Sequence, residues 1–227
     1  MVHIPRWRYW LSYLWEQTLE TTRGEYNDYL LVSLVHGRLQ LTAEEAIYSF
    51  GDYYLNFRKV FEVFQFSALP ARAEVLILGL GLGSIPELLS VHHGLDYQFT
   101  AVEIDPVIVE LAGRYSLPRL AAPVQVYTTD AAHFLQLNTR RFDFICMDVF
   151  QDATVPAELE RPEFLALLAA GLAPNGALLY NRLAATSADR AASQAFFDGP
   201  FKTAFPDGLV FDTGGNFILL NNGKFLT

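Results

Sequence analysis

The chain has 227 residues, of which 52% are hydrophobic and 18% charged, so it can bury a sizeable core and is not intrinsically disordered. Its single cysteine, Cys146, excludes an intrachain disulfide framework and the zinc sites that need two or more cysteines. Acidic residues outnumber basic ones by 25 to 16, which gives a net charge of −9. This charge argues against binding to nucleic acid or to an anionic membrane surface, because both require a basic field.

Two apolar segments are candidates for a membrane span or an export signal. The longest uncharged and mostly apolar stretch covers residues 164–180, and the turn-forming residues 174–176 interrupt it. The aromatic segment 9–15 is short, Glu16 ends it, and no small-x-small cleavage site follows. We therefore expect no membrane span, no signal peptide and a cytoplasmic protein.

The N-terminal part of the chain is rich in aromatic residues. Residues 1–66 hold 15 of the 32 aromatics and all three tryptophans, and such enrichment favours strands. We expect a small antiparallel β meander with strands over 11–22 and 25–35 and a third that starts at 38–41, followed by a helix over 52–66. This predicts a small N-terminal β domain with a linking helix over 1–66 and a larger domain over 67–227.

From residue 73 onwards, apolar strand patterns alternate with helical patterns. The expected strands are Glu74–Leu78, Tyr97–Val102, Val124–Tyr127, Phe142–Met147, Ala177–Tyr180 and Phe217–Leu220, with a weaker one near Leu209–Phe211. The expected helices are Ser84–His93, Pro106–Tyr115, Ala131–Leu137 and Pro156–Ala170. Strands without polar alternation are typical of a sheet that is buried on both faces, so the pattern predicts an α/β fold: a Rossmann-like, doubly wound, mostly parallel seven-stranded sheet.

A glycine-rich loop, residues 79–84, joins the first of these strands to a helix. Its spacing is G-x-G-x-G, and a dinucleotide-binding G-x-G-x-x-G motif would need glycine where Ser84 stands. Glycines allow a tight turn and a close approach of the backbone to a ligand. We expect this loop to contact a nucleoside and its polar tail without a pyrophosphate; the alternative is an ordinary glycine-rich turn.

Acidic residues end the next two strands. Glu103 stands 24 residues after Gly79, where an acid can accept hydrogen bonds from both ribose hydroxyls. Asp130 can accept from an adenine amino group, with the Ala131 amide facing a ring nitrogen. The alternatives are a solvated strand end for Glu103 and a helix N-cap for Asp130, and we expect Asp105 to be an N-cap. Ligands of open α/β sheets bind at these strand ends, which favours the nucleoside site.

Segments 75–84, 102–107, 129–135 and 142–148 together resemble the spermidine synthase family, a branch of the class I S-adenosylmethionine-dependent methyltransferase fold. The resemblance extends to residues 37–41 and 156–159 and covers roughly residues 10–220. It implies a nucleoside site formed by Gly79, Gly81, Gly83, Glu103, Ile104, Asp130, Ala131 and Asp148.

The departures from the family pattern concern the amine half of the site. Aminopropyltransferases carry an aspartate in the glycine loop that pairs with the free amine of decarboxylated S-adenosylmethionine, and Leu82 stands at that position here. The family's tyrosine-glutamine pair corresponds to residues 26–27, Tyr-Asn, and its tyrosine-histidine-glutamate segment to residues 48–50, Tyr-Ser-Phe. These changes favour intact S-adenosylmethionine as the cofactor over its decarboxylated form, which stays the alternative.

The family's pair of catalytic acids corresponds to Asp148 and Asp152, one residue farther apart than usual. Asp148 ends the fourth strand beside the expected sulfonium, where it could deprotonate or orient a nucleophile or attract a cationic substrate. The alternatives are a cap for Asp148 and a loop acid for Asp152. Tyr180 and Asn181 are candidates for the acceptor pocket or ordinary structural residues. No histidine or acid cluster has metal-ligand spacing, so we expect no metal.

Three functions fit the sequence: a methyltransferase acting on a small-molecule acceptor, an aminopropyltransferase with a rearranged amine site, and a nucleoside-binding oligomer without chemistry. Leu82 favours the first over the second. Five large rings at Trp7, Tyr9, Trp10, Tyr13 and Trp15 favour a homodimer formed through the N-terminal region, since aromatic residues are enriched at interfaces. The alternative is a flap that folds over the protein's own cleft.

Overall fold

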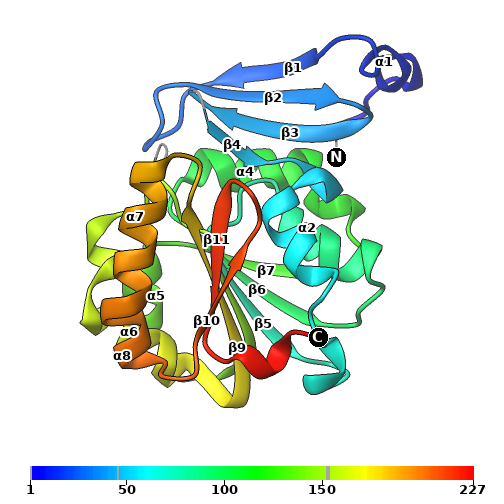
Figure 1. Cartoon of the computed structure of the whole chain (residues 1–227). Coiled ribbons are helices and arrows are strands. Elements are labelled where there is room, and N and C mark those ends of the chain that lie inside the picture. The colour runs from blue at the N-terminus through cyan, green and yellow to red at the C-terminus, as the bar shows by residue number, and fades with distance from the viewer. Residues whose placement is uncertain (1, 45, 152–153) are drawn as a thin grey trace.

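The computed structural model describes residues 2–44, 46–151 and 154–227, and it contains two β-sheets (Figure 1). The smaller sheet is an antiparallel meander in the order β1-β2-β3-β4, which confirms the predicted type of sheet. Its strands are β1 (Gln17–Thr22), β2 (Leu30–Val35), β3 (Arg38–Ala43) and β4 (Ala46–Ser49). The turn between β2 and β3 has φ values of 49° at His36 and 76° at Gly37, the conformation that a two-residue hairpin requires.

The prediction of one strand over 11–22 was wrong in its first half. Residues Arg6–Leu11 form the helix α1, and β1 begins only at Gln17. Pro5 precedes the helix, and Ser12 ends it by accepting the Gly37 amide proton while donating to the Tyr9 carbonyl. The aromatic residues that suggested a strand lie on the surface of this helix and of the turn that follows it.

The larger sheet has seven strands in the order β10-β11-β9-β8-β5-β6-β7. The five from β7 to β9 run parallel, and β11 pairs antiparallel with both β9 and β10. This confirms the predicted Rossmann-like sheet. Its strands are β5 (Glu74–Leu78), β6 (Gln98–Glu103), β7 (Val124–Thr128), β8 (Phe142–Met147), β9 (Leu172–Leu183), β10 (Leu209–Asp212) and β11 (Asn216–Leu220).

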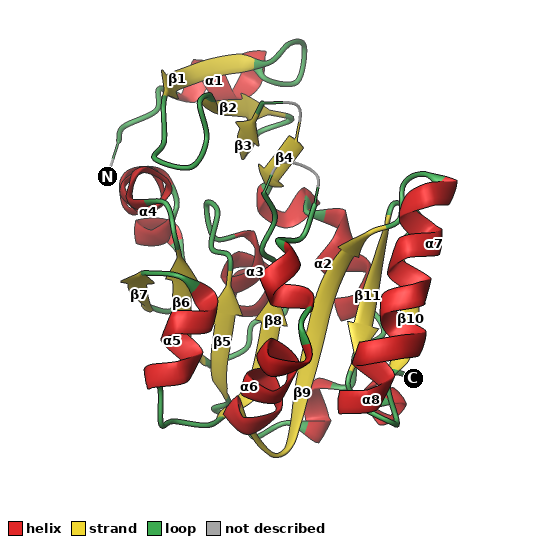
Figure 2. Cartoon of the chain, turned by 90° about the vertical axis from the view of Figure 1, so that its left-hand side faces the viewer, coloured by secondary structure: helices red, strands yellow, loops and turns green. Residues whose placement is uncertain are grey.

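Helices cover both faces of this sheet (Figure 2). One layer holds α2 (Leu55–Phe61), α3 (Ser84–Glu87, continued by a π-helical turn over Leu88–His92) and α4 (Pro106–Tyr115). The other holds α5 (Ala131–Leu137), α6 (Pro162–Gly171), α7 (Ser187–Phe196) and α8 (Lys202–Ala204). The helix predicted over 52–66 is shorter in the structure, where a 3-10 turn over Gly51–Tyr53 comes first and α2 covers only Leu55–Phe61. Likewise the predicted helix over 156–170 begins at Pro162, after a separate 3-10 turn at Ala157–Glu160.

The small sheet lies over the carboxyl ends of the parallel strands (Figure 2). Its buried side chains, such as Leu30 and Leu41, belong to the same hydrophobic cluster as α2 and α4. Helix α2 packs against the large sheet, with the Phe61 ring centroid 6.1 Å from that of Phe144. The division into units 1–66 and 67–227 stays a prediction. Among the described residues, no helix is both long and apolar enough to cross a bilayer.

Candidate functional site

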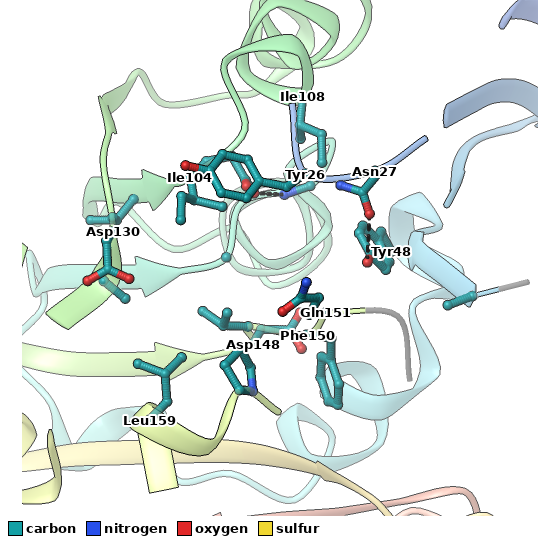
Figure 3. Close-up of a pocket in the computed structure, with 18 of the residues that line it drawn as sticks. Tyr26, Asn27, Tyr48, Ile104, Ile108, Asp130, Asp148, Phe150, Gln151 and Leu159 are labelled. Atoms are coloured by element: carbon teal, nitrogen blue, oxygen red, sulfur yellow. Dashed lines mark hydrogen bonds between the residues drawn. The ribbon is translucent and has the colours of Figure 1, made fainter. Parts of the chain in front are cut away.

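A cavity of about 520 Å³ lies at the carboxyl ends of the parallel strands, between the two sheets (Figure 3). Loops after β5, β6, β7 and β8 form its floor, and residues of the small sheet and its connections form its roof. Open α/β sheets bind ligands at this position, because loops on neighbouring strands diverge there and leave a crevice.

Most of the residues predicted for the nucleoside site line this cavity. They are Gly79, Gly81, Glu103, Ile104, Asp130, Ala131 and Asp148. Gly83 does not line it: with φ 84° it is the left-handed residue immediately before α3. The second predicted catalytic acid, Asp152, lies outside the described residues. The structure therefore brings the predicted strand-end residues together around one space.

The glycine loop passes unusually close to its neighbours. Gly79 has φ 88°, and a Cβ there would lie 2.3 Å from the carbonyl oxygen of Asp148. A Cβ at Gly81, where φ is 53°, would lie 3.0 Å from the carbonyl oxygen of Tyr48 at β4. Only glycine fits both positions, so the loop presents backbone to the cavity. Leu82 is 3% exposed and packs in the hydrophobic core.

Glu103 is buried and holds this loop in place. Its Oε2 accepts hydrogen bonds from the amides of Leu80 (3.1 Å) and Gly81 (3.3 Å), and its Oε1 accepts from the amide of Asp105 (3.2 Å). Burial raises the pKa of Glu103, and these backbone bonds oppose the rise. The alternative of a solvated strand end is thus wrong, because the carboxylate is a buried part of the cavity wall.

Asp105 and Asp130 both cap helices. Asp105 accepts from the Val107 amide at 2.9 Å, and Asp130 Oδ1 accepts from the His133 amide at 2.8 Å. No residue in the described part of the chain donates to Asp130 Oδ2, so the N-cap role leaves one carboxylate oxygen for a ligand. Asp105 also accepts from the amide groups of residues 25–27, which places Tyr26 and Asn27 over the cavity (Figure 3).

Asp148 is held in the cavity by two side chains that come from distant parts of the sequence. Its Oδ1 accepts from the Tyr54 hydroxyl at 3.1 Å and from Asn181 Nδ2 at 2.9 Å, and Asn216 Nδ2 donates to Asn181 Oδ1 at 3.0 Å. No described residue donates a hydrogen bond to Oδ2, which leaves that oxygen available to a bound molecule. Burial raises the pKa of Asp148 to about 7; the two hydrogen bonds lower it, and the charge of Glu103 adds to the rise. A carboxyl group with this pKa can take up and release a proton near neutral pH.

The sequence did not predict a role for Tyr54 or Asn216, and for Asn181 it left open a place in the acceptor pocket or a purely structural role. Asn181 is fully buried under Asp148, whereas Tyr180 is a core residue whose hydroxyl donates to the Leu159 carbonyl at 3.0 Å. Tyr54 comes from the turn before α2 and Asn216 from β11, so only the tertiary fold brings them to Asp148. The one sequence signal for any of these three residues is that Asn181 directly follows the predicted strand over 177–180, at the edge of the sheet where ligands bind.

The cavity is acidic. Its described lining includes Glu103, Asp130, Asp148 and Glu158 but no lysine, arginine or histidine. Such a wall attracts cations and disfavours anionic acceptors. In the described residues, no group of three histidine, cysteine or acidic side chains is arranged to hold a metal ion.

Comparison with protein families supports the resemblance seen in the sequence. The model of the spermine/spermidine synthase domain matches residues 63–187, which is more than half of the chain. The chain belongs to this family. Within the spermine/spermidine synthase family, a probable polyamine aminopropyl transferase from Bifidobacterium longum is 33% identical over 118 residues, which are 50% of this chain and 26% of that protein.

A methyltransferase is also among the relatives. The N-terminal histidine N-methyltransferase of Emericella nidulans is 36% identical over 117 residues, covering 49% of this chain and 20% of that protein. The chain thus spans about a quarter or less of these two relatives. A probable spermidine synthase from Corynebacterium glutamicum has the same fold, with a TM-score of 0.71, 19% identity, and coverage of 88% of this chain and 78% of that one.

Proposed function

We propose that the protein is a transferase that binds S-adenosylmethionine and transfers its methyl group to a small-molecule acceptor with an amine. The observation that carries this proposal is the arrangement of one cavity: a glycine loop, Glu103, Asp130 and Asp148 stand at the carboxyl ends of four neighbouring parallel strands and line the same space.

The proposed nucleoside contacts use the strand ends in chain order. Glu103 accepts from the ribose hydroxyls, Asp130 Oδ2 accepts from the adenine amino group, and the Ala131 amide faces a ring nitrogen, with Ile104 against the base. The glycine loop fits a ligand because Gly79 and Gly81 leave no side chain between the backbone and the cavity.

Methyl transfer is favoured by what the glycine loop lacks. Decarboxylated S-adenosylmethionine needs a partner for its free amine, and Leu82 supplies none, since it is buried in the hydrophobic core. The carboxylate of intact S-adenosylmethionine can instead accept hydrogen bonds from backbone amides.

Asp148 is the proposed base. S-adenosylmethionine supplies a methyl group on a positively charged sulfur. The acceptor nitrogen forms a bond to the methyl carbon, the carbon–sulfur bond breaks with its electron pair going to sulfur, and Asp148 Oδ2 accepts the proton that the nitrogen releases. Tyr54 and Asn181 hold Oδ1 and so orient Oδ2 towards the acceptor.

Aminopropyl transfer is the second candidate. The names of curated relatives favour it, and the acidic lining suits a polyamine. It would need an amine site different from the family's usual one, because Leu82 and residues 48–50 lack the usual acids. A non-catalytic nucleoside-binding oligomer is the third, and the hydrogen bonds that single out one oxygen of Asp148 argue against it.

The nucleoside product distinguishes these functions. The protein is incubated with a mixture of amines and either S-adenosylmethionine or its decarboxylated form, and the nucleosides are identified by mass spectrometry. Methyl transfer yields S-adenosylhomocysteine and aminopropyl transfer yields 5′-methylthioadenosine. We expect amine-dependent release of S-adenosylhomocysteine, and amine-dependent release of 5′-methylthioadenosine alone would overturn the proposal.

A further inference from the structure

A second cavity, of about 420 Å³, adjoins the candidate site, and we call it the outer cavity. Its lining residues are Ile47, Phe50, Tyr53, Tyr54, Leu55 and Asn56. Three of them, Ile47, Tyr54 and Asn56, also line the first cavity, so the two spaces share a wall. Because the Tyr54 hydroxyl donates to Asp148, the outer cavity begins one tyrosine side chain away from the proposed base.

The outer cavity is apolar and uncovered. Ile47 is 50% exposed, Leu55 52% and Tyr53 37%, and no residue in its described lining is charged. Single exposed hydrophobic residues are common on protein surfaces and need no explanation. Three of them around a hollow that continues a binding cavity are typical of a ligand-binding groove.

The described lining of the outer cavity offers no carboxylate to a second ammonium group. The Arg38 guanidinium lies 3.6 Å from the centroid of the Tyr53 ring. Asp52 accepts hydrogen bonds from two nitrogens of Arg38, so these two groups form an ion pair. A diamine that extended from Asp148 into this space would place its far ammonium among apolar and aromatic side chains, with no carboxylate in the described lining to pair with it.

We infer that the acceptor is a primary amine with an apolar extension, whose nitrogen lies at Asp148 and whose apolar part fills the outer cavity. The amine end of this inference rests on the proposed function, and the apolar end rests on the outer cavity itself. A substrate of this class differs from a polyamine in having one charged end.

The inference is tested by calorimetry with n-butylamine, n-hexylamine and n-octylamine, and with 1,4-diaminobutane and 1,6-diaminohexane. Each methylene group that enters the outer cavity should tighten binding about fourfold, and each diamine should bind more weakly than the monoamine of equal length. Leu55→Asp should abolish the gain with chain length and strengthen diamine binding. Leu137→Asp is the matched control, because Leu137 is 70% exposed at the end of α5 and should leave the series unchanged.

The titrations are run with and without saturating S-adenosylhomocysteine, whose own binding is measured first. Failure of the nucleoside to bind would contradict the proposed function, and the amine series would still be read from the protein alone. Affinity that does not rise with chain length, or diamines that bind more tightly than the matching monoamines, would overturn the inference. The same holds if Leu55→Asp behaves like the Leu137→Asp control.

Discussion

The burial of Asp148 predicts that this carboxyl group makes the stability of the protein depend on pH. Its pKa rises from 3.8 to about 7 on folding, with burial as the largest cause. Below pH 4 the group is neutral in both the folded and the unfolded chain. Between pH 4 and 7 the unfolded chain releases a proton that the folded chain keeps, so the free energy of unfolding falls as pH rises through this window and then levels off.

Asp148→Asn removes this dependence and preserves the contacts. An asparagine oxygen can still accept from Tyr54 and Asn181, so the hydrogen bonds at Oδ1 are retained. A shift of about three pKa units corresponds to an upper limit of about 4 kcal/mol, and water in the cavity screens part of it. We expect the free energy of unfolding of the variant, relative to that of the parent protein, to rise by about 2 to 3 kcal/mol between pH 4.5 and pH 8.5.

The assay is urea unfolding of both proteins at the two pH values, read as the difference in their free energies of unfolding. Asp96→Asn serves as the control, since Asp96 is an exposed acid paired with Arg72 on the surface, and its effect should differ little between the two conditions. If the difference for Asp148→Asn were the same at pH 4.5 and pH 8.5, the reasoning about the burial of this carboxyl group would be refuted.

Three further predictions concern the nucleoside, the glycine loop and the N-terminal helix. Glu103→Ala should weaken S-adenosylhomocysteine binding by about 1–3 kcal/mol in calorimetry, because ribose hydroxyls lose their buried acceptor; unchanged affinity would remove Glu103 from the site. Leu82→Asp should lower the free energy of unfolding by about 3 kcal/mol or more at pH 8, since it buries a carboxylate in the core; a folded variant of equal stability that prefers the decarboxylated donor would show that position 82 can face the ligand. We propose a homodimer through the exposed rings of α1 and its following turn, where Trp7 is 58%, Trp10 74% and Trp15 57% exposed; light scattering should give a dimer for the full chain and a monomer for Trp10→Glu, and a monomeric full chain at micromolar concentration would contradict it.

The large sheet and the strand-end residues could be predicted because the signals are local. The run from Glu74 to Leu78 is continuously apolar except at its first residue, and its bounds match β5. The glycine loop follows at once, and the acids Glu103 and Asp148 end or follow the next strands of the alternating pattern. Parallel strands place their carboxyl ends at one edge, so chain order was enough to bring these residues together.

The remaining features depend on tertiary contacts. The segment 6–11 has aromatic residues that favour strands, yet it is a helix, and its C-cap Ser12 accepts a hydrogen bond from the amide of Gly37, 25 residues farther along the chain. Tyr54 lies 94 residues before Asp148 and Asn216 lies 35 residues after Asn181, at positions that no local pattern marks. That Leu82 faces the core rather than the cavity also required the structure.

Calorimetry with S-adenosylmethionine and decarboxylated S-adenosylmethionine, measured side by side on the unaltered protein, tests the central claim most directly. We predict that intact S-adenosylmethionine binds more tightly, because its own carboxylate balances the charge of its amine, whereas the amine of the decarboxylated form needs a partner that the buried Leu82 does not supply. Tighter binding of the decarboxylated form would contradict the claim and would make aminopropyl transfer the better account of this site.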